Sequence, residues 1–374
     1  MLIINIVILL LYLLLIGTFV FGFDNVKTIP LEDIKAKINF SIIIPFRNEA
    51  ESLPDLLDSI LELNYTKHKF EILFIDDDSE DNSVKLIKNK LSKTKIDFSI
   101  LINEHHSNSP KKDAITKGIS QSKFDWIITT DADCKLPKYW LDSFDCFIQK
   151  NDTKFIIAPV TYYKTTSFLK RFQLLDFLSL QGVSIGALGI QKPILCNGAN
   201  LAYTKSLFLE LEGFNGNSNI SSGDDIFLLQ KAIHKYPKKI QYLKSESAIV
   251  KTTPQHNFKS LVSQRVRWAA KTSSYNSLFG KLTGVIVFLM NGFLVSAPLL
   301  CFTNFITIKT LTYTFIIKFC IDFLLLFKTT RFFNQESYLA SFFFSSFIYP
   351  FFSVYVVFIS VFKGYKWKDR AYTK

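Results

Sequence analysis

Three long stretches without a charged side chain constrain this chain more than any other feature of its sequence. They cover residues 1–23, 282–308 and 337–362. At about 1.5 Å per residue, a helix of each length crosses the roughly 30 Å hydrocarbon core of a bilayer. The 374 residues therefore predict a membrane protein. The remaining length suits one catalytic domain of about 200–250 residues.

The first apolar stretch has two interpretations, a cleaved signal peptide or a retained anchor. A signal peptide carries basic residues before its apolar run and small residues at its cleavage site. Residues 1–23 show neither feature, and the apolar run is longer than a typical signal core. The sequence therefore favours an N-terminal transmembrane anchor over residues 1–23.

The net charge of +12 raises the question of a nucleic-acid partner. No nucleic-acid-binding motif accompanies that charge, and basic residues crowd the flanks of the apolar stretches instead. Attraction to anionic lipids and retention of basic loops in the cytoplasm explain the charge more simply. The five cysteines have no C-x-x-C spacing, and the five histidines have no metal-ligand spacing. We therefore expect membrane lipids and no nucleic acid as partners, and a multi-pass protein of the inner (cytoplasmic) membrane whose catalytic domain faces the cytoplasm.

Residues 38–275 alternate between strand and helix patterns. Buried strands are predicted at 41–45, 70–75, 98–102 and 126–130, with helices between them. This alternation is typical of an α/β domain with a mostly parallel sheet, in which ligands bind at the carboxyl ends of the strands. Polar clusters follow three of these strands, namely Arg47-Asn-Glu49, Asp76-Asp-Asp78 and Asp131-Ala-Asp133.

The acidic clusters have both plain and functional interpretations. Asp131 and Asp133, one residue apart after a strand, could share Mg²⁺ or Mn²⁺ and through it a diphosphate. Loop carboxylates often face water instead. The acids at 76–78 could cap the next helix or bind a nucleotide, and these two roles are compatible.

Two further motifs lie later in the chain. Asp224 and Asp225 precede an apolar run, so they could cap a helix or supply a carboxylate that deprotonates an acceptor hydroxyl. Gln264-Arg-Val-Arg-Trp268 combines an amide, two guanidinium groups and an indole, which suits phosphate binding and stacking. An interfacial helix that extends its arginines toward lipid headgroups is the alternative.

Taken together and in order, these motifs resemble those of the family 2 inverting glycosyltransferases. The matching elements are Ile42-Ile-Ile-Pro45-Phe-Arg-Asn48-Glu49, Ile75-Asp-Asp77-Asp-Ser79-Glu-Asp81, Lys111 with Ala114 and Gly118, Asp131-Ala-Asp133, Asn197-Gly-Ala-Asn200 through Gly223-Asp-Asp225, and the Q-x-x-R-W motif at Gln264 to Trp268. The resemblance covers roughly residues 40–270. Each motif is weak alone, but six in the family's order are specific.

The resemblance implies a GT-A fold, a nucleotide-diphospho-sugar donor, a divalent cation (Mg²⁺ or Mn²⁺) and inversion at the anomeric carbon. By the same resemblance, Asp133 would bind the metal and Asp225 would be the general base, with Asp224 beside it. The remaining residues carried over from the family are Pro45, Glu49, Asp77, Lys111 and Asp131 for the donor, with Asp131 also near the metal, and Gln264, Arg267 and Trp268 for the diphosphate and the acceptor.

Two positions depart from the family pattern. Asp224 stands where the family often has glutamate, which is a small change. Lys112 and Asp113 replace the usual small residues after Lys111, which puts that part of the donor site in doubt.

Three functions are compatible with the sequence. The leading one transfers sugar to a polysaccharide or glycolipid acceptor, together with other glycan-assembly proteins. The second is a polyprenyl-phosphate sugar transferase of the same family, a class that usually lacks Q-x-x-R-W. The third is a non-catalytic scaffold that binds nucleotide sugars during glycan export, against which the intact D-x-D motif argues.

The C-terminal membrane region at 282–362 is predicted to hold two or three helices, followed by a basic tail at 363–374. Residues 310–327 are apolar except for Lys318 and Asp322, whose i,i+4 spacing allows an ion pair. If that segment spans, three crossings place the basic tail outside, against the positive-inside rule. If it does not span, the tail returns inside, but Lys309, Lys328 and Arg331 move outside. The sequence leaves both alternatives open.

Overall fold

The structure is a computed structural model that describes residues 2–218, 220, 222–271, 276–362, 365–367 and 370–372, the last two segments by their backbone alone. The chain divides into two compact units. We call Lys27–Tyr163 with Leu195–Thr253 the sheet domain. Met1–Val26, Lys164–Ile194 and Pro254–Lys374 form the other, which we call the helical unit.

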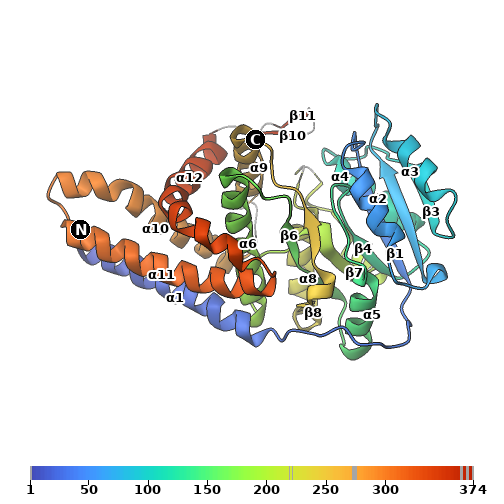
Figure 1. Ribbon diagram of the computed structural model, residues 1–374, viewed down its shortest axis with the longest axis horizontal. Coiled ribbons are helices and arrows are strands. Elements are labelled where there is room, and N and C mark those ends of the chain that lie inside the picture. The colour runs from blue at the N-terminus through green and yellow to red at the C-terminus, as the bar shows by residue number, and fades with distance from the viewer. Residues whose placement is uncertain are drawn as a thin grey trace. The chain divides into compact units, whose positions relative to one another are not determined.

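The sheet domain is built on a seven-stranded sheet with the order β3-β2-β1-β4-β7-β5-β8 (Figure 1). Neighbouring strands pair in parallel except for β7, which runs antiparallel to both β4 and β5. The expected mostly parallel α/β sheet is therefore confirmed. The strands are β1 (Phe40–Phe46), β2 (Phe70–Asp76), β3 (Asp97–Ile102), β4 (Trp126–Thr129), β5 (Phe155–Ile157), β7 (Leu201–Thr204) and β8 (Ile240–Tyr242).

Burial explains why these segments form the centre of the sheet. In β1, β2 and β4 almost every side chain is buried, as the continuous apolar runs predict for strands covered on both faces. Gly118 lets a helix approach β1 closely, because a Cβ atom there would lie 2.7 Å from Ile43 Cγ2. The helices of this domain are α2 (Leu53–Leu61), α3 (Ser83–Leu91), α4 (Pro110–Gln121), α5 (Trp140–Lys150), α7 (Lys205–Glu210) and α8 (Asp224–Lys235), and a small parallel pair is formed by β6 (Val160–Tyr162) and β9 (Val250–Thr252).

The helical unit contains long apolar helices and the helix that carries the Q-x-x-R-W motif. Its elements are α1 (Leu2–Asn25), α6 (Phe168–Gly189), α9 (Phe258–Ala270), α10 (Leu278–Phe302), α11 (Ile308–Phe332), α12 (Phe342–Phe362), and the hairpin of β10 (Tyr365–Trp367) and β11 (Arg370–Tyr372). In the described part of the chain, five helices are long and apolar enough to cross a membrane by length and composition: α1, α6, α10, α11 and Glu336–Phe362.

Helix α6 was not expected from the sequence, which placed residues 164–194 inside the soluble domain. It packs against α1 through glycines. A Cβ atom on Gly186 would lie 2.3 Å from Phe19 O, and one on Gly189 would lie 1.8 Å from Gly22 O. Only glycine allows backbones to approach so closely, which is a common device between membrane helices.

Candidate active site

The loops after β1 and β2 are tied together at the carboxyl edge of the sheet. Asn48 and Asp78 both adopt left-handed backbone conformations, with φ of 50° and 59°. The Asn48 side chain accepts a hydrogen bond from Glu80 N at 2.8 Å, while Arg47 Nη1 donates to Asp77 O at 3.0 Å. Residues outside glycine rarely adopt this conformation, and they do so mostly where surrounding bonds enforce it.

Pro45 and Glu49 belong to the same edge. Pro45 lies in β1 opposite Ile75 of β2. The backbone N–H of Glu49 donates to Ser83 Oγ at 2.9 Å, at the start of α3. Both residues therefore lie where the parallel strands β1 and β2 end.

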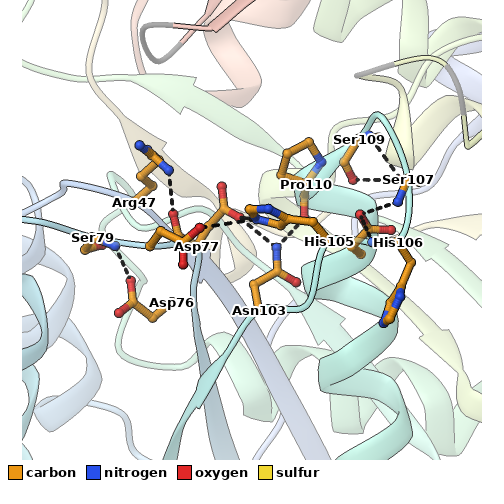
Figure 2. A network of polar contacts seen from close by, with 12 residues as sticks. Arg47, Asp76, Asp77, Ser79, Asn103, His105, His106, Ser107, Ser109 and Pro110 are labelled. Carbon is orange, nitrogen blue, oxygen red and sulfur yellow. Dashed lines mark hydrogen bonds and ion pairs between the residues drawn. The ribbon is translucent and has the colours of Figure 1, made fainter.

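Asp77 is the centre of a polar network that also involves the end of β3 (Figure 2). Its Oδ1 atom accepts from Asn103 Nδ2 at 2.7 Å and contacts His105 Nε2 at 2.6 Å. Asn103 Nδ2 also donates to Pro110 O at 3.0 Å, at the first residue of α4. The Asp77 carboxylate is thus oriented by groups that follow β3 and begin α4.

Asn103 and His105 were missed by the sequence analysis, which gave no role to any histidine. The sequence did contain a pattern that points to them. Asn103 and His105 come just after the predicted strand at 98–102, as the other polar clusters come just after their strands. Polar residues at a third neighbouring strand end could have been added to the site on that ground alone.

Lys111 joins the D-x-D segment to the start of α8. Its Nζ atom lies 2.7 Å from Asp131 Oδ1 and 3.4 Å from Asp224 Oδ2. Burial by itself would lower the pKa of Lys111, but the charges of Asp131 and Asp224 outweigh it and hold that pKa well above its ordinary value. The ammonium group is therefore a fixed positive charge at the strand ends.

Asp225 lies beside this ion pair, in the first turn of α8. Its Oδ2 atom accepts from Gly198 N at 3.2 Å. A Cβ atom on Gly198 would lie 2.9 Å from Asp224 Oδ2, so a larger residue there would displace the Asp224 carboxylate. The helix itself starts at Gly223, whose φ of 86° favours glycine. Both glycines belong to the motifs quoted above, and they explain how the two aspartates come close to Lys111.

The two departures from the family pattern after Lys111 have structural roles. Lys112 is buried, and its Nζ donates to Asn217 O at 2.7 Å and Ile220 O at 2.8 Å, in the segment before α8. Asp113 Oδ2 accepts from His106 N at 3.1 Å and Ser107 N at 3.0 Å. Lys112 therefore fixes the backbone of the segment that precedes Asp224. Asp113 fixes the turn that follows β3.

The D-x-D carboxylates suit a divalent cation that takes only one or two of its ligands from the protein. Among the described residues, no group of three or more Asp, Glu, His or Cys side chains could hold a metal ion. Mg²⁺ is often bound by one or two carboxylates, with substrate phosphates and water completing its shell. Asp131 is partly exposed, and Cys134 Sγ lies 3.8 Å from Asp133 Oδ1. Burial, followed by the charges of Asp133 and Asp131, raises the pKa of Cys134, so this thiol stays neutral beside the oxygen ligands.

The predicted acceptor residues lie on α9, in the helical unit. Gln264, Arg267 and Trp268 are each half-buried. Between them, Arg265 is buried, and its Nε lies 2.6 Å from Asp176 Oδ2 of α6. Arg265 and Asp176 were not among the predicted site residues, because the family motif leaves the position of Arg265 open.

Comparison with known protein families decides the identity of the fold. The pattern of glycosyl transferase family 2 matches residues 41–208, and that of glycosyl transferase family group 2 matches residues 126–362, more than half of the chain. The chain belongs to glycosyl transferase family group 2. The resemblance drawn from the motifs is thereby confirmed.

Individual relatives of this glycosyltransferase chain match shorter segments. A poly-beta-1,6-N-acetyl-D-glucosamine synthase of Staphylococcus aureus is 30% identical over 141 residues, which are 36% of this chain and 32% of the relative. An undecaprenyl-phosphate 4-deoxy-4-formamido-L-arabinose transferase of Pseudomonas savastanoi is 34% identical over 99 residues, 26% of this chain and 28% of the relative. The chain thus spans about a third of the length of the curated relatives it matches, or slightly less.

A solved structure matches nearly the whole chain. The mannosyltransferase of Pyrobaculum calidifontis, solved in complex with GDP-Man and Mn²⁺, superposes with a TM-score of 0.55 at 12% identity. The match covers 96% of this chain and 99% of that one. This likeness confirms the expected GT-A type of fold.

Proposed function

We propose that this protein transfers a sugar, with inversion, from a nucleotide-diphospho-sugar to a glycan or glycolipid acceptor. The observation that carries the proposal is Lys111, a largely buried cation between Asp131 and Asp224 at the carboxyl edge of the sheet. Family membership supplies the reaction class, and these three residues supply a charged site where such sheets bind ligands.

The nucleoside would lie along Asp77. In this assignment, Asn103 and His105 keep the Asp77 carboxylate in one orientation, so that it accepts a hydrogen bond from an N–H of the base. Pro45 and Glu49 would line the same edge. A donor with this nucleoside would extend its diphosphate toward the start of α4, where Lys111 follows Pro110.

The diphosphate leaving group carries the charge that the site must neutralise. Lys111 would bind its oxygens. Asp133, with Asp131 beside it, would hold Mg²⁺ or Mn²⁺. When bound, the cation supplies further positive charge to the diphosphate. Mn²⁺ in the mannosyltransferase of similar fold supports a divalent metal in this type of site.

Asp225 is proposed as the general base. It would take the proton of the acceptor hydroxyl while the acceptor oxygen bonds to the anomeric carbon from the face opposite the leaving group. The bond from that carbon to the phosphate oxygen breaks, and the nucleoside diphosphate leaves with the electron pair. One displacement inverts the anomeric centre without a covalent intermediate. The hydrogen bond from Gly198 N to Asp225 Oδ2 supports an oriented carboxylate.

A polyprenyl-phosphate acceptor is the second candidate. One relative is named as an undecaprenyl-phosphate transferase and another as a poly-N-acetylglucosamine synthase, so both acceptor classes occur among similar proteins. Gln264, Arg267 and Trp268 favour a glycan acceptor, since an indole stacks well on the apolar face of a sugar ring.

We also propose that the catalytic domain faces the cytoplasm of a multi-pass protein in the inner (cytoplasmic) membrane. Nucleotide sugars are predicted to be available there, and the apolar helices support a membrane location. Membrane lipids and other glycan-assembly proteins would be its further partners.

The test is a transfer assay with the full-length protein in lipid nanodiscs and a panel of UDP- and GDP-sugars. Donor consumption and product are followed by mass spectrometry with short oligosaccharides or polyprenyl phosphate as acceptors. Transfer to oligosaccharides that stops with EDTA and in Asp133→Asn supports the proposal. Transfer to polyprenyl phosphate alone supports the second candidate. Donor binding without hydrolysis or transfer would identify a scaffold, and full activity in EDTA would exclude the metal role.

A further inference from the structure

Helix α9 carries one buried charge within a motif whose other polar members are half-buried. The helix starts at a capping box in which Asn257 and Ser260 satisfy each other's backbone N–H groups. Its apolar face, Leu261 and Val266, packs against Phe172 of α6 and against α12. Arg265 extends from this buried side, and its nearest ionic partner is Asp176, 2.6 Å away and also buried.

The guanidinium group of Arg265 contacts more than its ionic partner. Its Nη1 donates to the side-chain oxygen of Gln264. Its Cζ lies 4.2 Å from the centre of the Trp268 ring, a stacking distance for a cation over an indole. On α6, Phe177 lies 6.1 Å from the same ring, centre to centre. One buried side chain thus contacts two of the three predicted acceptor residues.

We propose that Arg265, held by Asp176, is a positioning residue that sets the orientation of Gln264 and Trp268 for the acceptor. This inference rests on the proposed function for its consequence, but the orientation of Trp268 can be measured without any activity. Burying a charge is costly unless a partner compensates it, and the Asp176 carboxylate provides that partner. The planar, forked guanidinium allows a bond to Asp176, a bond to Gln264 and stacking on Trp268 at once, which a lysine ammonium does not.

The first arm of the test observes Trp268 directly. The protein is labelled with 5-fluorotryptophan and examined by ¹⁹F NMR in nanodiscs, with the Trp268 signal assigned from Trp268→Phe among the four tryptophans. Arg265→Lys keeps a cation beside Asp176 but removes the planar group from the indole, so we expect the Trp268 signal to shift. Asp176→Asn is expected to shift it too, because the guanidinium loses its anchor. Lys259→Gln, which removes an exposed cation from the same helix, is the matched control and should leave the signal unchanged.

The second arm measures transfer. We expect Arg265→Gln and Asp176→Asn to lower kcat by roughly 10–100-fold, since a misplaced acceptor group can cost about two orders of magnitude. The donor KM should stay within about twofold, and Arg265→Lys should recover part of kcat. Donor KM values that rise as steeply as kcat falls would overturn the inference, as would an unchanged Trp268 signal and unchanged kcat in both Arg265→Lys and Asp176→Asn. If the wild type transfers no sugar, the proposed function fails, and the ¹⁹F signals still decide whether Arg265 positions Trp268.

A second, independent inference concerns the course of the chain through the membrane. Helices α1 and α11 run in the same direction, since Asn5 Nδ2 donates to Thr314 Oγ1 near one end and Asp24 pairs with Lys328 near the other. Helix α10 runs back between these ends, joined to α11 by the turn at 303–307. The N-terminus of α1 and this turn therefore lie at one end of the helices, which we call the far end. The start of α10 and the end of α11 lie at the other, which we call the near end.

Helix α12 starts beside the middle of α11 and runs toward the far end. Its Phe342 lies 4.8 Å from Phe319, and its Phe347 lies 4.5 Å from Phe315, ring centre to ring centre. Pro350 lies inside the helix, where proline removes a backbone hydrogen bond and bends it. Figure 1 shows that α12 is bent along its course.

After the bend, α12 returns to α9. Phe352 lies 6.2 Å from Phe258, the first residue of α9, which follows β9 of the sheet domain after five residues. The strand β10, just beyond α12, also contacts α9. The geometry points to a re-entrant α12 that leaves the membrane on the side from which it entered.

Helix α6 does not cross either in this arrangement. The chain enters it from β6 and leaves it toward β7, and both strands belong to the sheet domain, so one crossing would divide that domain between two compartments. Crossings by α1, α10 and α11 then leave the basic tail at 363–374 on the side of the sheet domain. This course removes the conflict with the positive-inside rule that the sequence analysis left open.

The test uses tobacco etch virus protease sites in the full-length protein, inserted into the turn at 303–307 or after Lys374. A site in the turn between α3 and β3, within the sheet domain, serves as the reference. Sealed vesicles of both orientations are treated with the protease. We expect the C-terminal site to be cleaved in the same vesicles as the reference site, and the 303–307 site in the opposite ones. Cleavage of the C-terminal site on the side opposite to the reference site would overturn the re-entrant course.

Discussion

In the sheet domain, Lys111 shares its charge between Asp131 and Asp224, and the Asp131 side chain keeps 37% of its surface exposed. In the helical unit, Arg265 meets Asp176 and Lys318 meets Asp322, and three of these four side chains are less than 10% exposed. Both regions place cations beside carboxylates. The first arrangement includes an additional carboxylate open to solvent, whereas the second places each cation against a carboxylate largely enclosed by protein.

The difference indicates two uses of the same interaction. A partly exposed cluster with additional carboxylates can exchange its partners for a charged ligand and a metal ion. An enclosed pair is not open to a ligand from solvent, and its removal affects the arrangement of helices instead. Tyr12 strengthens this second role, because its hydroxyl donates to Asp322 at 2.6 Å and so joins α1 to the pair on α11.

The largest effect is expected in the sheet domain, from Asp225→Asn. Loss of a positioned base typically costs 10²–10⁴-fold in rate, so kcat should fall by roughly that factor while donor binding, measured by calorimetry, persists. Asp224→Asn is the matched variant, and because Asp224 pairs with Lys111 it should weaken donor binding as well. If Asp224→Asn abolished turnover while Asp225→Asn retained it, the base would be the neighbouring residue.

A smaller effect, on stability alone, is expected from the Lys318–Asp322 pair. Lys318→Met leaves a carboxylate without its ionic partner near the middle of α11, which should lower the free energy of unfolding by about 2.5–3.5 kcal/mol. Lys318→Met combined with Asp322→Leu should be less destabilising than Lys318→Met alone. Thermal unfolding in nanodiscs measures both variants. Comparable losses in the single and double variants would show that the pair is not a coupled unit.

The smallest effect on the free energy of unfolding is expected from an exposed ion pair, which serves as the reference for the enclosed pairs. Lys90 Nζ lies 2.5 Å from Asp58 Oδ1, with both side chains more than 40% exposed. Lys90→Gln should change the free energy of unfolding by less than about 1 kcal/mol and should matter even less at high salt. The same unfolding assay applies. A loss as large as that of Lys318→Met would mean that enclosure does not distinguish the two regions.

The sequence predicted the sheet domain well because its signals are local. The strand runs at 41–45 and 70–75 correspond to β1 and β2, with at most one added residue at each strand end. The common edge at which the polar clusters after β1, β2 and β4 lie follows from the parallel pairing of these strands. The roles assigned to those residues stay predictions until the variants are measured.

The helical unit was predicted less well because its decisive contacts join distant segments. Helix α6 carries Gln173, Asp176 and Gln181 among apolar residues, and it is covered on most sides, so no polar face marks it in the sequence. The partner of Arg265 lies 89 residues earlier, which no local pattern reveals. The return of α12 likewise depends on packing against α9 rather than on hydropathy.

The glycine contact between α1 and α6 has a consequence for the order in which the protein is made. Helix α1 leaves the ribosome before α6, whose contacts with it at Gly186 and Gly189 are synthesised about 160 residues later, which takes on the order of ten seconds at roughly 5–20 residues per second. Until then, Gly22 lacks the Gly186 backbone that packs against it. A generic membrane anchor in place of α1 would insert normally, yet it would offer α6 no surface of matching shape. Helix α1 therefore provides the surface against which α6, synthesised later, packs. Exchange of α1 for another membrane helix tests the assembly of the helical unit rather than its targeting to the membrane.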